Sequence, residues 1–261
     1  MPPSRTLFEI DGPLARLTIN RPEARNAMTW DMYDALCDAC ERVDAEEAVR
    51  VFVLKGAGGQ AFVSGTDIAE FTTFSSPQDG IGYEQRLDRI IDRLERVTKP
   101  TIAQVEGVAA GGGCLMAIAC DLRVCTPQAR FGIPIARTLG NSLSAASTAR
   151  IIDLIGPARA KDLLLTGRLI DAEEAAALGL VTRMADAKEI DQSVRELATT
   201  IAAHAPLTIR AAKELIRRIL VSRRSGAVEA EDLIALCYSS ADFKEGVAAF
   251  LEKRPPKFTG R

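Results

Sequence analysis

TIAQVEGVAAGGGC, at residues 101–114, is the stretch of sequence that decides the fold. Residues 101–106 predict a β-strand, and the glycines after them predict a tight turn that opens into a helix. Glycine lets a backbone come close to a ligand because it has no Cβ, and the first N–H groups of a helix have no partner within it. Since a helix N-terminus also carries partial positive charge, this turn suits an anionic oxygen, with a plain structural turn as the alternative.

A second turn of this kind lies upstream, in AFVSGTDI at residues 61–68. It follows the β-branched apolar run VRVFVLK at 49–55, which predicts a strand covered on both faces. Two backbone N–H donors, one from each turn, could together stabilise an enolate if they converged on one carbonyl oxygen. Losing one donor of such a pair typically costs about 2.7–4 kcal/mol, so the two turns together are more informative than either alone.

Strands and helices alternate along the chain up to about residue 190. Hydrophobic periodicity predicts a hairpin around Gly12-Pro13 and a helix with Thr29 as its N-cap, whose buried face carries Met32, Leu36, Cys40 and Val43. A helix at 77–97 and a strand at 122–126 follow. Such alternation is typical of βαβ units and a mainly parallel sheet.

The remainder of the chain is predicted to be helical. The expected helices span 187–203, 206–223, 227–239 and 241–253. We therefore predict an α/β protein with a core at 1–195 and a C-terminal helical region at 196–261, which packs on its own core or on another subunit and completes the site.

Charge and composition exclude several classes of function. The chain has 33 basic and 35 acidic residues, a net charge of −2 and no block of like charge, so no nucleic-acid or membrane partner is expected. The most apolar stretch, 107–120, is shorter than the about 20 residues that cross a bilayer. The N-terminal MPPSRTLFEI lacks the layout of a secretory signal, which favours a cytoplasmic location.

Motifs for other chemistries are incomplete. Cys37 and Cys40 form a C-x-x-C pair, but His204 is the single histidine and no second pair exists, so we expect buried thiols and no metal site. The phosphate-binding patterns G-x-x-x-x-G-K-[ST] and G-x-G-x-x-G do not occur. Ser64 has no nearby base in the sequence, so a hydrolytic triad has little support.

The two turns belong to a longer set of motifs that resembles the crotonase (enoyl-CoA hydratase/isomerase) superfamily. The matching segments are Arg21-Pro22, Asn26-Ala27, AFVSGTD at 61–67, Lys99-Pro100, GVAAGGG at 107–113, Cys120-Asp121, FGIP at 131–134, LTGR at 165–168, 175–181 and FLEKR at 250–254. The resemblance implies a spiral of ββα turns with a C-terminal helical region, assembled as homotrimers or hexamers. It also implies an acyl-CoA thioester substrate, with no cofactor other than the coenzyme A of that substrate.

The resemblance also assigns roles to residues. It implies that the backbone N–H groups of Thr66 and Gly112 form an oxyanion hole. The residues expected to contact the acyl group or coenzyme A are Arg25, Ala61, Gly65, Asp67, Ile68, Gly111, Leu115, Ile135 and Lys253. Arg25 and Lys253 are cations suited to the nucleotide phosphates, with a solvated surface role as the alternative. For Asp67 the alternative is structural, because an acid at a helix start is favoured by the helix dipole.

Two positions depart from the hydratases that the chain resembles. Those enzymes carry one glutamate directly after G-G-G-x and a second directly after F-G-x-P, and these positions are Leu115 and Ile135 here. An aliphatic side chain cannot move a proton, and each general acid or base is commonly worth about 10²–10⁴ in rate. Ordinary hydration by a glutamate pair is therefore not expected.

Several residues are candidates to replace the missing glutamates. Gly140-Asn141 resembles the segment that precedes a nucleophilic aspartate in 4-chlorobenzoyl-CoA dehalogenases, and Ser142 stands in the place of the aspartate. Asn141 and Ser142 are therefore candidate catalytic residues, and N-capping of a helix is the alternative for Ser142. Glu84, Arg137 and Tyr238 are further candidates, and sequence patterns do not define their positions.

The function predicted from the sequence is an acyl-CoA enzyme of the lyase or isomerase class, in fatty acid metabolism, that holds a thioester enolate in a backbone oxyanion hole. Other reactions of this superfamily stay open, namely isomerisation, decarboxylation, thioester hydrolysis and dehalogenation. A non-catalytic acyl-CoA-binding protein is the alternative outside enzymology.

Overall fold

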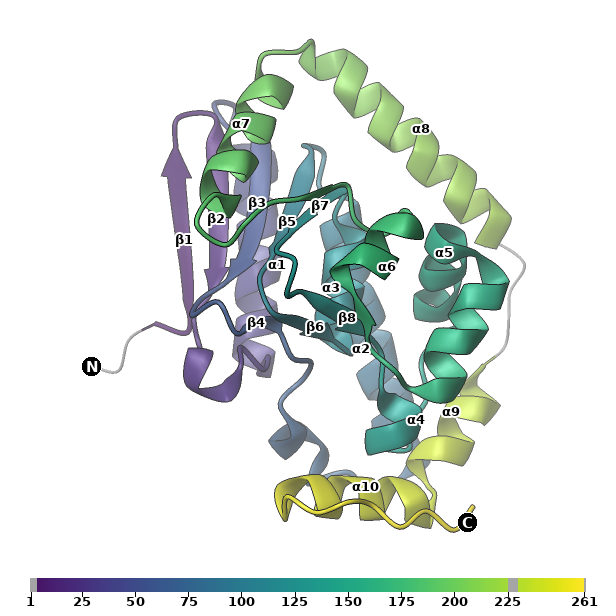
Figure 1. Cartoon of the computed structure of the whole chain (residues 1–261). Helices are drawn as coiled ribbons and strands as arrows, with labels where there is room; N and C mark the ends of the chain where they lie inside the picture. The colour runs from purple at the N-terminus through teal and green to yellow at the C-terminus, as the bar shows by residue number, and fades with distance from the viewer. Residues whose placement is uncertain (1–3, 225–229, 261) are drawn as a thin grey trace.

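Two β-sheets form the centre of the protein (Figure 1). The computed structural model describes residues 4–224 and 230–260. In the larger sheet the strand order is β1-β2-β3-β5-β7-β10. These strands are β1 (Thr6–Asp11), β2 (Leu14–Ile19), β3 (Val51–Gly56), β5 (Thr101–Val105), β7 (Leu122–Cys125) and β10 (Arg183–Met184). β1 and β2 form the predicted antiparallel hairpin, and the other pairings of this sheet are parallel.

A smaller sheet is built from short strands that follow those of the larger one. Its order is β4 (Ala61–Val63), β6 (Val108–Ala110), β8 (Arg130–Gly132) and β9 (Ile170–Asp171). The helices that come after successive strand pairs are α2 (Pro77–Glu95), α3 (Gly112–Ala119), α4 (Ile135–Thr138) and α5 (Ala145–Thr166). Because β3-β4, β5-β6 and β7-β8 each place one strand in either sheet before a helix, the chain forms repeated ββα turns. The α/β prediction is confirmed.

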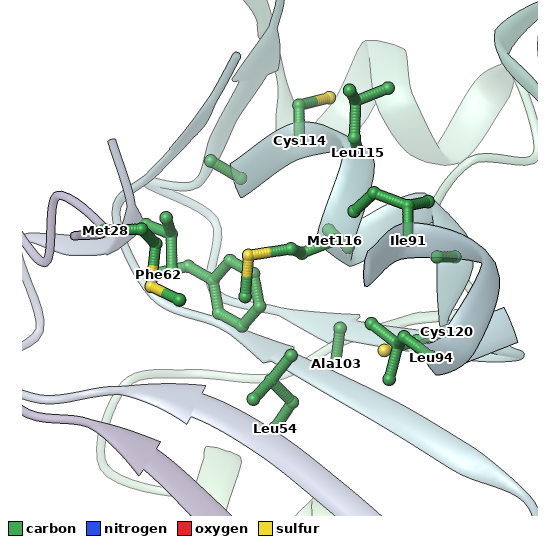
Figure 2. Packing of buried hydrophobic residues seen from close by; sticks show 14 of the residues in the cluster. Met28, Leu54, Phe62, Ile91, Leu94, Ala103, Cys114, Leu115, Met116 and Cys120 are labelled. Carbon is green, nitrogen blue, oxygen red and sulfur yellow. The ribbon is translucent and has the colours of Figure 1, made fainter. Parts of the chain in front are cut away.

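The main core lies between the larger sheet and the helices α1 (Trp30–Ala45), α2 and α3. α1 begins after Thr29 as predicted. All four side chains predicted for its buried face are buried, namely Met32, Leu36, Cys40 and Val43. α3 has apolar residues all round and is enclosed by protein, as such a helix must be. Figure 2 shows Met116 pointing from α3 toward Phe62, while Leu115 leaves the helix on another side.

The C-terminal helices take three different places. α7 (Ile190–Ala202) covers the second face of the larger sheet, where Val194 and Leu197 pack against Val53 and Ile102. α9 (Glu231–Tyr238) packs on α2, and α10 (Ala241–Leu251) lies beside the short helix η2 (Ile68–Phe71). The predicted helices are confirmed within a few residues, except that residues 227–229 of one lie outside the described residues. The proposed boundary after residue 195 falls inside α7.

α8 (Pro206–Arg224) runs along the outside of the molecule (Figure 1). None of its described residues is buried, and Leu215, Ile216 and Ile219 are 59%, 60% and 54% exposed. Lys213 attaches the helix to the body through an ion pair of 2.7 Å with Asp121. A single chain therefore leaves an apolar face of α8 uncovered. None of the helices in the described ranges is both long and apolar enough to cross a membrane.

Candidate active site

The turns that follow β4 and β6 lie side by side. β4 and β6 are parallel neighbours with Val63 opposite Ala109, so the chain leaves both strands at the same edge of the smaller sheet. A Cβ added to Gly112 would lie 3.9 Å from the amide nitrogen of Thr66. The fold thus brings together the two amides that the sequence singled out.

Neither amide is used by the protein's own backbone. The Met28 amide donates to the carbonyl of Gly65 and the Asp67 amide donates to the carbonyl of Met28, both at 2.8 Å, which holds the backbone on either side of Thr66. Gly112 is the first residue of α3, where an N–H has no acceptor within the helix. In the ranges 4–224 and 230–260 neither the Thr66 nor the Gly112 amide donates a backbone hydrogen bond. Their role as an oxyanion hole stays a prediction.

Two glycines of the second turn are required by its geometry. Gly111 has φ of 53° and ψ of −125°, a conformation that side chains strongly disfavour. A Cβ on Gly113 would lie 2.0 Å from the carbonyl oxygen of Val63, so only glycine lets α3 approach β4 this closely. The triple glycine therefore sets the distance between the two turns.

Three hydroxyl groups beside these amides form a chain. Tyr33 Oη and Thr66 Oγ1 share a hydrogen bond of 2.9 Å, and Thr66 Oγ1 and Tyr83 Oη share one of 2.8 Å. A Cβ on Gly112 would lie 2.6 Å from Tyr33 Oη. Burial raises the pKa of both tyrosines, so their hydroxyls stay protonated at neutral pH. Sequence reasoning missed Tyr33, for which the available signal was its place on the buried face of α1.

Aromatic rings surround this chain of hydroxyls. The contacting rings have centroids 4.8–6.2 Å apart and belong to Trp30, Tyr33, Phe71, Phe74, Tyr83, Tyr238 and Phe243. Their tilted and T-shaped arrangements are favourable for ring quadrupoles. Since Tyr238 and Phe243 come from α9 and α10, the C-terminal helices enclose the same cluster as α1 and α2.

A buried carboxyl group lies in the same region. Glu84 is 1% exposed, and its two oxygens accept hydrogen bonds from the Tyr238 hydroxyl at 2.7 Å and the Ser144 amide at 2.9 Å. Burial raises the pKa of Glu84 to about 7, against the opposing effect of these two hydrogen bonds. Asn141 Nδ2 donates to the Tyr238 hydroxyl at 3.1 Å, which extends the network. Glu84 therefore titrates near neutral pH.

The structure gives Asn141 and Ser142 different surroundings. Asn141 Oδ1 is buried and has no partner among the described residues. The Ser142 hydroxyl donates to the carbonyl of Leu143 at 3.2 Å. The N-cap of α5 is Ser144, whose hydroxyl accepts from the Ser147 amide at 3.0 Å. The N-cap alternative for Ser142 is wrong, because the helix begins two positions later than that role requires. The catalytic roles of Asn141 and Ser142 stay predictions.

The two positions that depart from the hydratase pattern lie among apolar side chains. Leu115 is fully buried in the first turns of α3 (Figure 2). Ile135 is the first residue of α4 and is half-buried against the main core. Arg137, also in α4, is exposed. Neither Leu115 nor Ile135 has a titratable group, so any acid or base must come from elsewhere.

The loop that carries Arg25 is attached to the first turn. Asn26 is fully buried, and its side-chain amide donates to the carbonyls of Ala57 at 2.9 Å and Ala61 at 2.7 Å. The Ser64 amide donates to the Arg25 carbonyl at 3.2 Å. Arg25 and Asn26 adopt φ of 51° and 57°, which places the exposed Arg25 side chain beside this turn.

The other expected ligand contacts differ in exposure. Asp67 accepts a hydrogen bond from the Ala69 amide at 3.0 Å and pairs with Arg21 at 2.5 Å, as the N-cap of η2. These contacts agree with a structural role for Asp67 at the start of a helix, which is the alternative to ligand binding. Ile68 is buried, whereas Lys253 is exposed just after α10.

The C-x-x-C pair of Cys37 and Cys40 lies in α1. In the described ranges no group of three or more His, Cys, Asp or Glu side chains is placed to hold a metal ion. Cys40 is buried, and burial raises the pKa of its thiol to about 12, so it does not form a thiolate at neutral pH.

Two solved structures with a similar architecture are named as enzymes of acyl-CoA thioesters. The crystal structure of an enoyl-CoA hydratase/carnithine racemase from Magnetospirillum magneticum matches with a TM-score of 0.80 and 35% identity, covering 99% of this chain and 96% of that one. A methylmalonyl-CoA decarboxylase in complex with 2-nitronate-propionyl-CoA matches with a TM-score of 0.89 and 25% identity, covering 99% of both. The fold is therefore the crotonase fold, as the sequence resemblance implied.

Sequence comparison agrees with the fold. The family model of enoyl-CoA hydratase/isomerase matches residues 9–261. The crotonyl-CoA hydratase of Syntrophomonas wolfei is 35% identical over 258 residues, which is 98% of this chain and 98% of that protein. The chain belongs to the enoyl-CoA hydratase/isomerase (crotonase) family.

Proposed function

We propose that this protein is an enzyme that acts on acyl-CoA thioesters and stabilises a thioester enolate with the amides of Thr66 and Gly112. The observation that carries the proposal is the pair of unpaired N–H groups on adjacent turns. Negative charge that develops on the thioester oxygen gains most from fixed donors in a site with little water. The names of the relatives, which are enoyl-CoA hydratases, support a reaction of the lyase or isomerase class.

The proton-transfer groups differ from a pair of glutamates. Leu115 and Ile135 occupy the positions that the sequence resemblance gives to those glutamates, and neither can act on water or on an α-carbon proton. Classical hydration is therefore slow in this proposal. Isomerisation, thioester hydrolysis and dehalogenation remain compatible with an oxyanion hole, and so does the binding of acyl-CoA without catalysis.

Decarboxylation is the second candidate, and the apolar character of Leu115 and Ile135 favours it. When a 2-carboxyacyl thioester loses CO₂, the electron pair of the broken C–C bond becomes the enolate, which then takes a proton from water to give the acyl-CoA, so no base is needed at the α-carbon. Apolar side chains cannot hydrogen-bond to the carboxylate of such a substrate, so they destabilise it and favour its loss as CO₂. The structural match to a methylmalonyl-CoA decarboxylase, with a TM-score of 0.89, supports this candidate.

Coenzyme A is proposed to bind along the first turn as part of the substrate. Arg25 is exposed beside Ala61 and Gly65, where its cation can meet the nucleotide phosphates. Ile68 supplies apolar surface next to this turn, and Lys253 is a second exposed cation. The proposal requires no other cofactor.

A homotrimer or hexamer is the proposed assembly. The apolar side chains of α8, among them Ile216 and Ile219, lie exposed in one chain. A cavity of about 500 Å³ beneath α8 is lined in part by Ile118, Leu154 and Ile216, which extends this apolar surface inward. Contact with another copy would remove both from water.

Calorimetric titration with crotonyl-CoA tests the placement of the thioester. Gly112→Val introduces a Cβ 2.6 Å from Tyr33 Oη and fills the space between the turns, so binding should weaken by at least about 100-fold. Gly82→Ala in α2 is the control, because a Cβ there meets nothing within 4 Å, and its affinity should equal that of the wild type. Equal affinities of all three proteins, with folding checked by circular dichroism, would reject this site.

Incubation with methylmalonyl-CoA tests the second candidate. Mass spectrometry should then detect propionyl-CoA with the wild type and not with Gly112→Val. Unchanged methylmalonyl-CoA after prolonged incubation with a wild type that binds crotonyl-CoA would exclude decarboxylation of this substrate.

A further inference from the structure

The chain of hydroxyls contains one proton that has no acceptor. Tyr33, Thr66 and Tyr83 bring one hydroxyl proton each, and the chain contains two hydrogen bonds. Whichever way these bonds are directed, two protons are used and one remains. In residues 4–224 and 230–260 these hydroxyls have no other hydrogen-bond partner. Because a buried donor without a partner costs about 1–3 kcal/mol, this position suits an oxygen atom of a ligand.

The chain of hydroxyls ends next to the proposed oxyanion hole. Thr66 carries both the central hydroxyl of the chain and one of the two free amides. Tyr33 Oη is the atom that a Cβ on Gly112 would meet at 2.6 Å, so this hydroxyl lies beside Gly112, the residue that carries the second free amide. The three side chains are 0% (Tyr33), 8% (Thr66) and 7% (Tyr83) exposed. A ligand oxygen held by both amides would therefore lie close to the Tyr33 hydroxyl.

One of the possible directions of the hydrogen bonds leaves the free proton beside Gly112. If Tyr83 donates to Thr66 and Thr66 donates to Tyr33, the proton left over is the one on Tyr33, at the end nearest Gly112. Burial raises the pKa of both tyrosines, and the nearby carboxyl of Glu84 raises them further, so both remain donors.

We propose that the Tyr33 hydroxyl is a third hydrogen-bond donor to the thioester oxygen, and that Thr66 and Tyr83 are positioning residues that orient it. This inference rests on the function proposed above and adds a side chain to a hole otherwise made of backbone. No proton is transferred. A hydrogen bond to the enolate oxygen is charge-assisted and about twice as strong as one to the neutral carbonyl, so the hydroxyl stabilises the enolate more than the bound substrate.

Acetoacetyl-CoA is the probe for this inference, because its enolate absorbs in the near ultraviolet and reports ionisation of the bound ligand directly. The apparent pKa of the bound ligand is measured by spectrophotometric titration. Tyr33→Phe should reduce the preference of the site for the enolate by about 10- to 100-fold, the usual value of a hydrogen bond to a charged group. Tyr83→Phe and Thr66→Val should have smaller effects, and Thr66→Ser should restore the wild-type value.

Thr200→Val is the control. The Thr200 hydroxyl donates to the carbonyl of Glu196 at 2.9 Å in α7 and is not part of the chain of hydroxyls, so the enolate preference should stay at the wild-type value. Equal values for Tyr33→Phe and the wild type would overturn the inference while leaving the proposed function intact, provided that Gly112→Val loses binding. A wild type that neither binds acetoacetyl-CoA nor favours its enolate would overturn both.

Discussion

The hydroxyl of Tyr238 donates a 2.7 Å hydrogen bond to Oε1 of Glu84, which joins α9 to α2 across 154 positions of sequence. The other oxygen of Glu84 accepts from the Ser144 amide, at the start of α5. A Cβ on Gly80 would lie 2.2 Å from the Tyr238 ring, so α2 and α9 are as close as glycine permits. One buried carboxyl group therefore connects three helices around the proposed site.

The first prediction concerns the pH dependence of stability. Burial raises the pKa of Glu84 from an ordinary value of 4.5 to about 7, so the unfolded chain loses this proton first as the pH rises. The contribution of Glu84 to the free energy of unfolding is therefore complete below pH 4.5. It falls by up to about 3 kcal/mol as the pH rises through 7. Glu84→Gln removes the titrating group. From pH 5 to pH 8, the free energy of unfolding of this variant should therefore improve relative to wild type by up to that amount.

Urea unfolding at both pH values checks this prediction, at one protein concentration. Thr200→Val is the control, because it changes an exposed side chain that does not titrate, and its difference from wild type should not change with pH. A constant difference between Glu84→Gln and wild type at both pH values would contradict the assigned pKa.

The second prediction concerns the loop before α1. The Asn26 side chain makes hydrogen bonds to three backbone groups. It donates to the two carbonyls named above and accepts from the Arg21 amide at 2.9 Å. Asn26→Ala leaves these groups buried and unpaired, which should lower the free energy of unfolding by about 2–4 kcal/mol. Asn26→Gly loses the same bonds but tolerates φ of 57°, so it should be about 1 kcal/mol less damaging. Chemical unfolding measures both variants, and a loss below about 0.5 kcal/mol for alanine, the usual size of a surface substitution, would contradict this role of Asn26.

The third prediction concerns hydration. Wild-type protein should bind crotonyl-CoA but hydrate it more slowly than an enzyme with two glutamates, by roughly 10²–10⁴ for each missing group. Leu115→Glu combined with Ile135→Glu should restore activity only in part, because both positions pack in or against the apolar core, which does not orient a carboxylate.

Loss of enoyl-thioester absorbance measures the hydration rate. Gly112→Val serves as a control for contaminating hydratase. Rapid hydration by wild type that is abolished in this control would show that residues such as Glu84 or Ser142 supply the acid and base.

The fourth prediction concerns assembly. Light scattering should give a mass three or six times that of the 28.1 kDa chain. Ile216→Glu combined with Ile219→Glu places charges on the exposed apolar face of α8 and should produce monomers. Arg223→Glu, at the exposed end of the same helix, should leave the mass unchanged. A wild type that is monomeric at micromolar concentration would refute the proposed assembly.

Local patterns predicted the two turns and most helices. The triple glycine at 111–113 and the apolar run at 49–55 each carry their signal within a few residues, and parallel pairing of β4 with β6 then brings the turns together. The short strands were not predicted, because runs of two or three residues are too short for an alternation of side chains to be recognised.

The side chains beside the turns could not be predicted in the same way. Glu84 lies on the buried face of α2, although a charged residue in a sequence normally indicates an exposed position. Its partners come from α5 and α9. The bond between Tyr33 and Thr66 depends on how α1 docks against the first turn. The N-cap of α5 is Ser144 and not Ser142; both serines precede that helix, and capping preference alone does not choose between them.

The central claim is that the amides of Thr66 and Gly112 bind the thioester oxygen, and isotope-edited infrared spectroscopy tests it most directly. The measurement compares the carbonyl stretch of crotonyl-CoA, labelled with ¹³C at the thioester carbon, free in solution and bound to the wild-type protein. Two or more donors that polarise the carbonyl should move the band of the bound ligand to lower frequency. A bound thioester whose carbonyl band stays at its solution frequency would contradict the account.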